Sequence, residues 1–152
     1  MPARIFMDPN PVTLHPADTI CEAAQMLMEH RYRSLPVVDD DGRFLGIVSV
    51  NCLLHLVLPK AATMRKGLET MPYVTTSLDS LRNELKKVID QPVTICLGED
   101  IKVVHPDTST VETLLTLYKT RKSLPVVDKE TGRLEGVISY FDVGSKIMEE
   151  GI

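Results

Sequence analysis

The sequence contains two closely similar segments, and this internal repeat is the feature that most constrains the fold. SLPVVDDDGRFLGIVS runs from Ser34 to Ser49, and SLPVVDKETGRLEGVIS runs from Ser123 to Ser139. The similarity extends to residues 12–52 and 102–142, with one residue missing before the second SLPVV and one added after it. A unit of roughly 50 residues buries too little surface to be stable alone. We therefore expect two copies of one unit that depend on each other.

Each copy predicts the same order of secondary structure. Short strands are expected at residues 12–14 and 102–104, where a His-Pro pair follows. An S/T-x-x-E capping box, Thr19 with Glu22 and Ser109 with Glu112, then predicts the start of a helix. Helical spacing predicts that the apolar stripes of these helices are buried. The stripes consist of Ile20, Ala23, Ala24 and Leu27 in the first copy and Val111, Leu114, Leu115 and Tyr118 in the second.

The quoted phrase itself predicts a β-hairpin followed by a helix. An apolar run, an Asp/Gly turn and a second apolar run are typical of a hairpin, and a helix is expected after Ser49 and after Ser139. The unit is therefore β-α-β-β-α, and the fold class is α/β of the α+β type. We expect repeat 1 at residues 1–60, a connecting segment at 61–91 and repeat 2 at 92–152. One packed helix is expected in the connection, behind a Thr76-x-x-Asp79 box, with an apolar stripe of Leu78, Leu81, Leu85 and Val88.

Charge and hydropathy exclude several classes of partner. The chain has 21 acidic and 17 basic residues and no block of Lys or Arg, which argues against nucleic acid or an anionic membrane. It has neither an apolar run of about 18 residues nor the apolar core of a signal peptide, so a cytoplasmic protein without a membrane span is expected. Cys21, Cys52 and Cys96 share no close spacing, so we expect reduced thiols and neither a disulfide framework nor a zinc site.

The ordered motifs resemble those of the cystathionine β-synthase (CBS) domain family. They are V-x-x-H-P-x-x-T-x-x-E-A, R-S-L-P-V-V-D, G-R-x-x-G-I-V-S and, in the second copy, S-Y-F-D, over roughly residues 4–58 and 92–149. The resemblance implies a tandem pair, or Bateman module, with the repeats packed sheet to sheet about a pseudo-two-fold axis. It implies a non-catalytic regulatory module, usually a homodimer, that binds AMP, ADP, ATP or S-adenosylmethionine between repeats and acts on a partner protein.

The resemblance also implies a ligand site centred on Asp142. In the family, the Ser ending the third strand and the Asp three residues later face the ligand, and these are Ser139 and Asp142 here. A carboxylate has two acceptor oxygens, which match the two hydroxyls of a ribose diol. The S-x-x-D pattern is also a helix-capping signature, and a cap alone would account for both residues.

Four further positions are implied as contacts. Arg33 and Lys122 stand where related domains place basic groups near phosphate, although a solvated basic rim would explain them equally well. The adenine wall is expected from the first copy, near His15, Tyr32 and Arg33, largely through backbone atoms.

The first copy departs from this pattern at Cys52, which stands where the second copy has Asp142. A thiol is a poor acceptor for a ribose diol, so the two sites should be unequal. We expect one good site per chain, and a weak, altered or empty one near Ser49 and Cys52.

Other chemically suggestive residues have simpler interpretations. His15 and His105 match each other before Pro, which favours a structural place over a shared metal site. Cys52 and His55 could form a nucleophile and base, but a buried thiol beside an exposed imidazole is the commoner arrangement. The run from Asp39 to Asp41 is typical of a hairpin turn rather than a Mg²⁺ site.

Two functions remain after these exclusions. The first is a module that senses an adenosyl ligand. The second is a structural module for dimerisation or partner binding, with its clefts empty. An enzyme ranks third, because the repeats and their connecting helix occupy nearly every residue.

Overall fold

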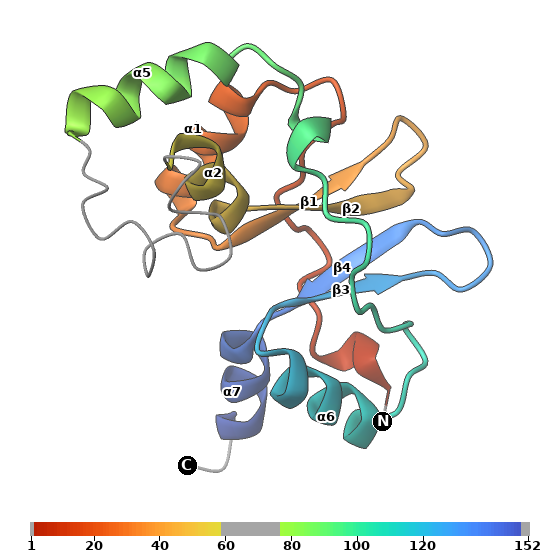
Figure 1. Cartoon of the computed structure of the whole chain (residues 1–152). Coiled ribbons are helices and arrows are strands. Elements are labelled where there is room, and N and C mark those ends of the chain that lie inside the picture. The colour runs from red at the N-terminus through yellow and green to blue at the C-terminus, as the bar shows by residue number, and fades with distance from the viewer. Residues whose placement is uncertain (1, 59–76, 150–152) are drawn as a thin grey trace. The chain divides into compact units, whose positions relative to one another are not determined.

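The computed structural model describes residues 2–58 and 77–149 of the chain (Figure 1). It confirms the α+β class. Within these residues the chain forms two compact units, each interrupted in sequence. The first unit contains Met1–His15, Pro36–Gly46 and Glu99–Ile152, and the second contains Pro16–Leu35 and Ile47–Gly98.

The repeated helices begin and end at equivalent residues in the two copies. Helix α1 spans Ile20–His30 and helix α6 spans Thr110–Thr120. The hydroxyl of Thr19 accepts a hydrogen bond from the Glu22 amide, and Ser109 accepts one from Glu112, both at 3.2 Å. Both helices end at an arginine in the left-handed conformation, Arg31 and Arg121, each with φ of 57°. The predicted Ser/Thr caps are therefore confirmed, but the reciprocal bonds expected from the carboxylates of Glu22 and Glu112 are not formed.

The buried face of α6 differs from the prediction. In α1 the expected residues Ile20, Ala23 and Leu27 are fully buried. In α6 the equivalent face carries Thr113 and Leu117. The buried Thr113 hydroxyl is satisfied because it donates to the Ser109 carbonyl at 2.8 Å.

The apolar stripe predicted for α6 therefore lies mostly on the outside. Val111 is 76% exposed, Leu115 is 47% exposed and Tyr118 is 74% exposed, while Leu114 packs partly against the core. The prediction was wrong because it followed apolarity alone, whereas the repeat places the core face one residue away. An outward-facing stripe of this kind is typical of an interaction surface.

Two β-hairpins follow the two helices, as predicted. Strands β1 (Ser34–Val38) and β2 (Phe44–Ser49) form one two-stranded sheet. Strands β3 (Leu124–Val127) and β4 (Leu134–Ile138) form the other, which is antiparallel with a bulge at Val126/Val127. The bulge lies just before the turn that carries the extra residue of the second copy. The hairpins continue into helices α2 (Val50–Val57) and α7 (Tyr140–Met148), which were also predicted.

Each hairpin turn is built around the side chain of its first aspartate. Asp39 Oδ1 accepts hydrogen bonds from the amides of Asp41 and Arg43, both at 2.9 Å. Asp128 Oδ1 likewise accepts from the amides of Thr131 and Glu130, and these bonds hold the pKa of Asp128 below its usual 3.8. The turn interpretation of the first aspartate run is confirmed.

The strands expected before His-Pro are shorter than predicted. Leu14 and Val104 each form a single parallel bridge, with Val37 and Val126 respectively. Leu14 donates to the Pro36 carbonyl at 2.8 Å and accepts from the Val38 amide at 2.9 Å. A proline after the histidine cannot donate to a ladder, which limits the pairing.

The first unit is completed by the opening segment of the first repeat. Its hydrophobic core joins residues of both repeats. Its members are Ala3, Phe6, Val104, Leu117, Leu124, Val126, Ile138 and Val143. The 3₁₀-helix η1 (Ala3–Ile5) supplies the first of these, and all members beyond Phe6 belong to the second repeat. Asp8 then pairs with Val137 of β4 through two backbone hydrogen bonds of 2.8 and 3.1 Å.

The second unit mirrors this exchange. The 3₁₀-helix η2 (Val93–Cys96) opens the second repeat and belongs to the unit that holds α1 and α2. Its Val93 and Cys96 are buried. Gly98 pairs with Ile47 of β2 through two backbone hydrogen bonds of 2.8 and 3.0 Å. The opening segment of each repeat therefore packs in the unit of the other repeat, so neither copy forms a complete core by itself.

A further helix, α5 (Leu78–Val88), lies in the connection as predicted and contacts α2 (Figure 1). Its cap is Ser77, which accepts from the Ser80 amide at 3.1 Å, so the expected box with Asp79 is wrong; Thr76 lies outside the described residues. The expected burial is also only partial. Leu78 is 61% exposed, and Leu81, Leu85 and Val88 are half-buried. No described helix combines the length and apolarity needed to cross a bilayer.

Gly136, the glycine of the repeated phrase, allows the opening segment to approach β4. A Cβ atom at this position would lie 2.5 Å from the Asp8 carbonyl oxygen and 2.9 Å from Met7 Sδ. We predict that Gly136→Ala lowers the free energy of unfolding by about 1–3 kcal/mol, because backbone must move to admit the methyl group. Thermal unfolding measures the change.

Gly144→Ala provides the matched control. Nothing lies within 4 Å of a Cβ at Gly144 in α7, so the same substitution there should leave stability unchanged or raise it. Equal melting temperatures for Gly136→Ala and the unsubstituted chain would contradict the close approach of the opening segment.

Candidate ligand site

The predicted residues Ser139 and Asp142 form a complete capping box at the start of α7. Asp142 Oδ2 accepts from both the amide and the hydroxyl of Ser139, each at 2.9 Å. The Ser139 hydroxyl in turn accepts from the Asp142 amide at 3.1 Å. Among the described helices, α7 alone carries the reciprocal bond of the box. The helix-capping role considered for Ser139 and Asp142 from the sequence is therefore observed.

The cap leaves acceptor capacity on Asp142. Both hydrogen bonds use Oδ2, and Oδ1 bonds to no described residue. The residue is half-buried in the first turn of α7, just after β4. An ionised carboxylate can accept about four hydrogen bonds, so capping and ligand binding are compatible at this side chain.

Lys122 lies at the same end of the β3–β4 hairpin. Leu124 pairs with Ile138, so the residues just before β3 and just after β4 are neighbours in the sheet register. Lys122 is exposed and forms no ion pair with any described residue. The first unit therefore carries a carboxylate, a hydroxyl, a helix N-terminus and a lysine at the same end of one hairpin.

The other three predicted contacts are placed differently. His15 belongs to the same unit, and its Nε2 lies 2.8 Å from Asp40 Oδ1. Tyr32 and Arg33 belong to the second unit. Tyr32 stacks on His30 with ring centroids 5.2 Å apart, and the Arg33 carbonyl accepts from the Val50 amide at 2.8 Å.

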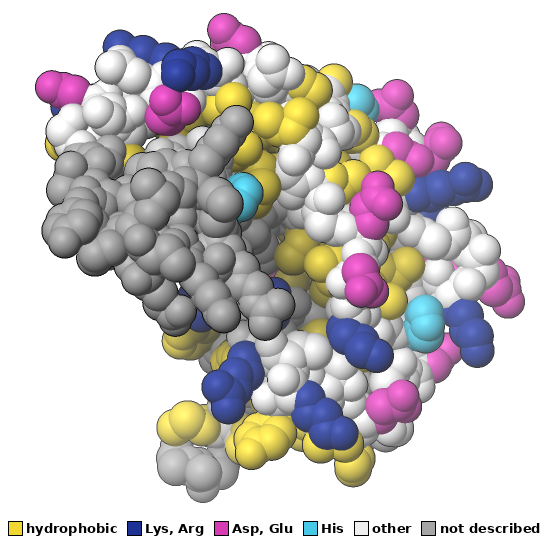
Figure 2. All heavy atoms as spheres, in the orientation of Figure 1, with side chains coloured by type: hydrophobic (Ala, Val, Ile, Leu, Met, Phe, Trp, Pro, Cys, Tyr) yellow, Lys and Arg dark blue, Asp and Glu magenta, His cyan; other side chains and the backbone are white. Residues whose placement is uncertain are grey.

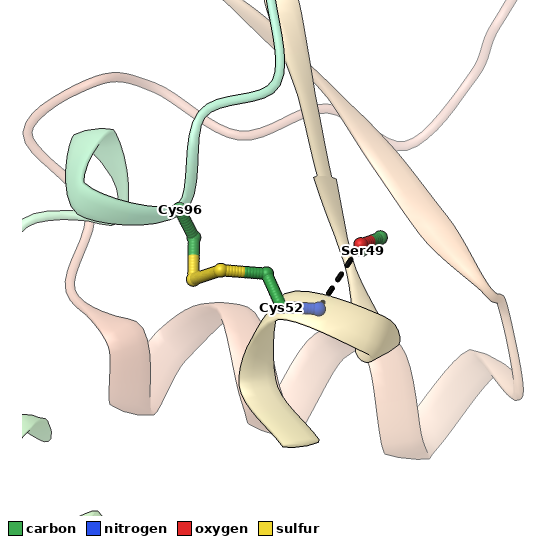
Figure 3. The surroundings of a disulfide bond; sticks show 3 residues. All are labelled: Ser49, Cys52 and Cys96. Carbon is green, nitrogen blue, oxygen red and sulfur yellow. Dashed lines mark hydrogen bonds between the residues drawn. A yellow bond between two sulfur atoms is a disulfide. The ribbon is translucent and has the colours of Figure 1, made fainter. Parts of the chain in front are cut away.

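Cys52 of the first repeat is joined to Cys96 by a disulfide, so the prediction of reduced thiols was wrong (Figure 3). The two Cα atoms lie 5.8 Å apart across 44 residues of sequence. The exchange of opening segments carries Cys96 to the first turn of α2. Ser49 still caps that helix, accepting from the Cys52 amide at 3.2 Å. The bonded sulfur also excludes Cys52 and His55 as a nucleophile and base in this state.

The sequence contained a signal for this pair that the motif comparison missed. Extending the repeat alignment back by six residues matches Cys96 with Phe6, just as Cys52 matches Asp142. Phe6 lies in the core that includes Val143, the residue after Asp142. The two cysteines therefore occupy equivalents of neighbouring positions in the other unit.

His105 has a structural contact within its own unit. His105 Nδ1 lies 2.8 Å from the Val127 carbonyl oxygen, which holds the ring against β3. The turns of the hairpins form an open pocket of about 790 Å³, which is lined by both acidic and basic side chains. Its lining includes Asp39, Asp40, Asp41, Arg43, Glu130 and Arg133. Across the part of the chain that the structure describes, no three His, Cys, Asp or Glu residues are grouped to hold a metal.

Curated relatives match most of this chain. An uncharacterized 17.7 kDa protein of Acidianus ambivalens is 28% identical over 135 residues, covering 88% of this chain and 65% of its own length. The chloroplastic CBS domain-containing protein CBSX2 of Arabidopsis thaliana is 28% identical over 145 residues, covering 91% of this chain and 60% of its own. The chain thus spans less than two thirds of the length of these relatives.

Solved structures share the fold. CBSX2, crystallised in complex with AMP, has a TM-score of 0.69 at 24% identity and covers 96% of this chain and 95% of its own. The CBS domain pair of protein MJ0100, in complex with 5′-methylthioadenosine and S-adenosylmethionine, has a TM-score of 0.62 at 18% identity, covering 97% and 95%. The family model of the CBS domain matches residues 3–59 and again residues 93–149, so this chain belongs to the CBS domain family as a tandem pair.

Proposed function

We propose that this chain is a non-catalytic regulatory module that binds one adenosine-containing ligand at Ser139 and Asp142. The observation that carries the proposal is the unused Oδ1 of a half-buried carboxylate whose other oxygen is fixed by the cap. The capping box holds this side chain in one position before a ligand arrives. A hydroxyl of a ribose diol would donate to Oδ1, which differs from the two-oxygen match expected from the sequence because the cap already uses Oδ2, and no change of the helix start is required.

A phosphorylated ligand fits the neighbouring groups. The first turn of α7 presents backbone N–H groups and the positive end of the helix dipole. Lys122 adds a full positive charge at the same end of the hairpin. This combination favours AMP, ADP or ATP, whereas S-adenosylmethionine would use the diol contact alone.

Two relatives support the adenosyl class. The structure of CBSX2 contains AMP, and that of MJ0100 contains 5′-methylthioadenosine and S-adenosylmethionine. All three ligands carry an adenosine group with a ribose diol. The contributions of His15, Tyr32 and Arg33 stay predictions, as does a partner protein that responds to the ligand.

The first repeat lacks the corresponding carboxylate. Cys52 stands in its place with its sulfur bonded to Cys96. The site near Ser49 is therefore proposed to be the weaker one. A structural module with empty clefts is the alternative function, and the observation that favours it is that the Ser139–Asp142 cap is complete without a ligand.

We also propose a homodimer that uses the outer faces of α6 and α7. Exposed apolar side chains gather on these helices, and Figure 2 shows hydrophobic side chains at the surface over this end of the chain. They are Val111, Leu115, Tyr118, Tyr140, Phe141, Ile147 and Met148. Phe141 is 86% exposed, and burying one such ring contributes about 2 kcal/mol.

We predict that Asp142→Asn abolishes the thermal shift caused by the adenosyl ligand. A ligand at 100 times its dissociation constant adds about 2.7 kcal/mol of stability, or roughly 5–10 °C in melting temperature for a domain of this size. The amide keeps the size of the side chain but loses the charged acceptor. The measurement is a thermal-shift panel of AMP, ADP, ATP, S-adenosylmethionine and adenosine on both proteins.

Glu112→Gln is the matched control, because Glu112 also occupies the third position of a capped helix but lies in α6. Its shift should equal that of the unsubstituted chain. Lys122→Ala should reduce the shift with AMP more than the shift with adenosine. If no compound raises the melting temperature, the empty-cleft alternative is correct; an undiminished shift in Asp142→Asn would place the ligand elsewhere.

For the dimer, we predict that Tyr118→Glu and Phe141→Glu each shift the chain toward monomer. A charge at either position would be buried without a partner at the proposed interface, which costs several kcal/mol. Sedimentation velocity over a concentration series measures the dimer dissociation constant. Leu78→Glu, at a comparably exposed leucine of α5, should leave it unchanged. A chain that is monomeric before any substitution would remove the dimer proposal.

A further inference from the structure

The Cys52–Cys96 disulfide is not required by the fold, because the other unit reaches the same arrangement without it. In the first unit, residues 2–8 pair with Ser109 and with Val137. In the second unit, residues 92–98 pair with Thr19 and with Ile47 in the equivalent way. The first unit has no covalent bond at this place. The disulfide is therefore an addition to a segment that backbone pairing already holds.

We propose that Cys52 and Cys96 form a reversible redox site that fastens residues 92–98 to the start of α2. In the oxidised state, the bond joins the first turn of the helix to the opening segment of the second repeat. In the reduced state, two thiols replace it, and the backbone bridges and the buried side chains of the segment hold it without a covalent link. This site is independent of the adenosyl ligand proposed at Asp142.

The two cysteines differ in exposure, which sets the order of reduction. Cys96 is 6% exposed, while Cys52 is half-buried on the helix that follows Ser49. The incoming thiolate of a dithiol reductant therefore attacks Cys52 Sγ and displaces Cys96 as a thiolate, which takes a proton from solvent. The second thiolate of the reductant then attacks its own bonded sulfur and releases Cys52.

The products balance, and the helix favours the second step. The reductant ends as a disulfide, and the cysteine pair has gained two electrons and two protons. Cys52 leaves from the first turn of α2, where free N–H groups and the helix dipole stabilise a negative sulfur. Cys21 is the remaining cysteine and is not in a disulfide.

Thiol counting tests the chemistry. The native chain is titrated with mixtures of reduced and oxidised dithiothreitol, alkylated with a maleimide and weighed by mass spectrometry. We expect one reactive thiol in the oxidised chain and three after reduction without denaturant, with full reversal on reoxidation. Three thiols under all oxidising conditions, or a bond that dithiothreitol cannot reduce in the native chain, would overturn the proposal.

Hydrogen exchange tests the consequence, and the chain supplies its own control. Reduction should speed exchange of the Gly98 and Ile47 amides by about tenfold or more, because local opening of residues 92–98 becomes easier. The equivalent amides of Asp8 and Val137 should not change. Equal rates in the two states, or faster exchange at all four amides through global unfolding, would contradict a local fastening.

Substitution of the two cysteines distinguishes a local link from a bond that folding requires. Cys52→Ser with Cys96→Ser should lower the melting temperature by about 10 °C while keeping a single cooperative transition. Cys21→Ser should leave the melting temperature and the redox response as they are. A double variant that fails to fold would show that the fold requires the disulfide. Loss of the cooperative thermal transition in the reduced native chain would show the same.

Discussion

The reciprocal exchange of opening segments is the constraint on which the rest of the structure depends. Residues 2–8 belong to the core of the second repeat, and residues 92–98 belong to the unit of the first. Each segment adds two backbone hydrogen bonds to the far edge of a hairpin, at Val137 or at Ile47. The glycine of the repeated phrase permits this approach, since any side chain at Gly136 would collide with the Asp8 backbone. A single copy would lack part of its own core, which explains why the sequence is doubled.

The same exchange accounts for the difference between the two repeats. In the first unit, the segment brings Phe6 into the core beside the start of α7, and Asp142 keeps a free oxygen. In the second unit, the segment brings Cys96 to Cys52, and the equivalent position becomes a covalent link. One duplicated framework thus carries a carboxylate with an unused oxygen in one unit and a disulfide in the other. We propose that these equivalent positions serve ligand binding in the first unit and redox chemistry in the second.

Much of this fold could be predicted from the sequence, because the determining interactions are local and occur twice. Caps at Thr19 and Ser109, the turn at Asp39 and the helices after both hairpins follow from short motifs. The predictions failed where apolarity and packing diverge. The side chains of Val111 and Tyr118 were predicted to be buried but face outward. Thr113 is buried instead, and its hydroxyl is satisfied because it donates to the Ser109 carbonyl. The strands predicted before His-Pro are single bridges in the structure, because the proline that follows has no backbone N–H to donate.

Part of the candidate site could be predicted for the same reasons. Ser139 and Asp142 stand in a local motif, and hairpin register places Lys122 at the same end. The disulfide was not predicted, since its partners are 44 residues apart and meet only through the exchange. Nor could spacing decide between a cap and a ligand contact at Asp142. The structure shows that the cap occupies one oxygen and leaves the other, so the two roles are compatible.

The ligand stoichiometry tests the central claim most directly. Equilibrium dialysis of labelled AMP against the purified chain, carried to saturation, measures how many molecules each chain holds. The asymmetry between Asp142 and the bonded Cys52 predicts one tightly bound molecule per chain, with any second molecule at the weaker site near Ser49 bound about tenfold or more less tightly. Two equivalent molecules per chain, or none at saturating AMP, would contradict the account.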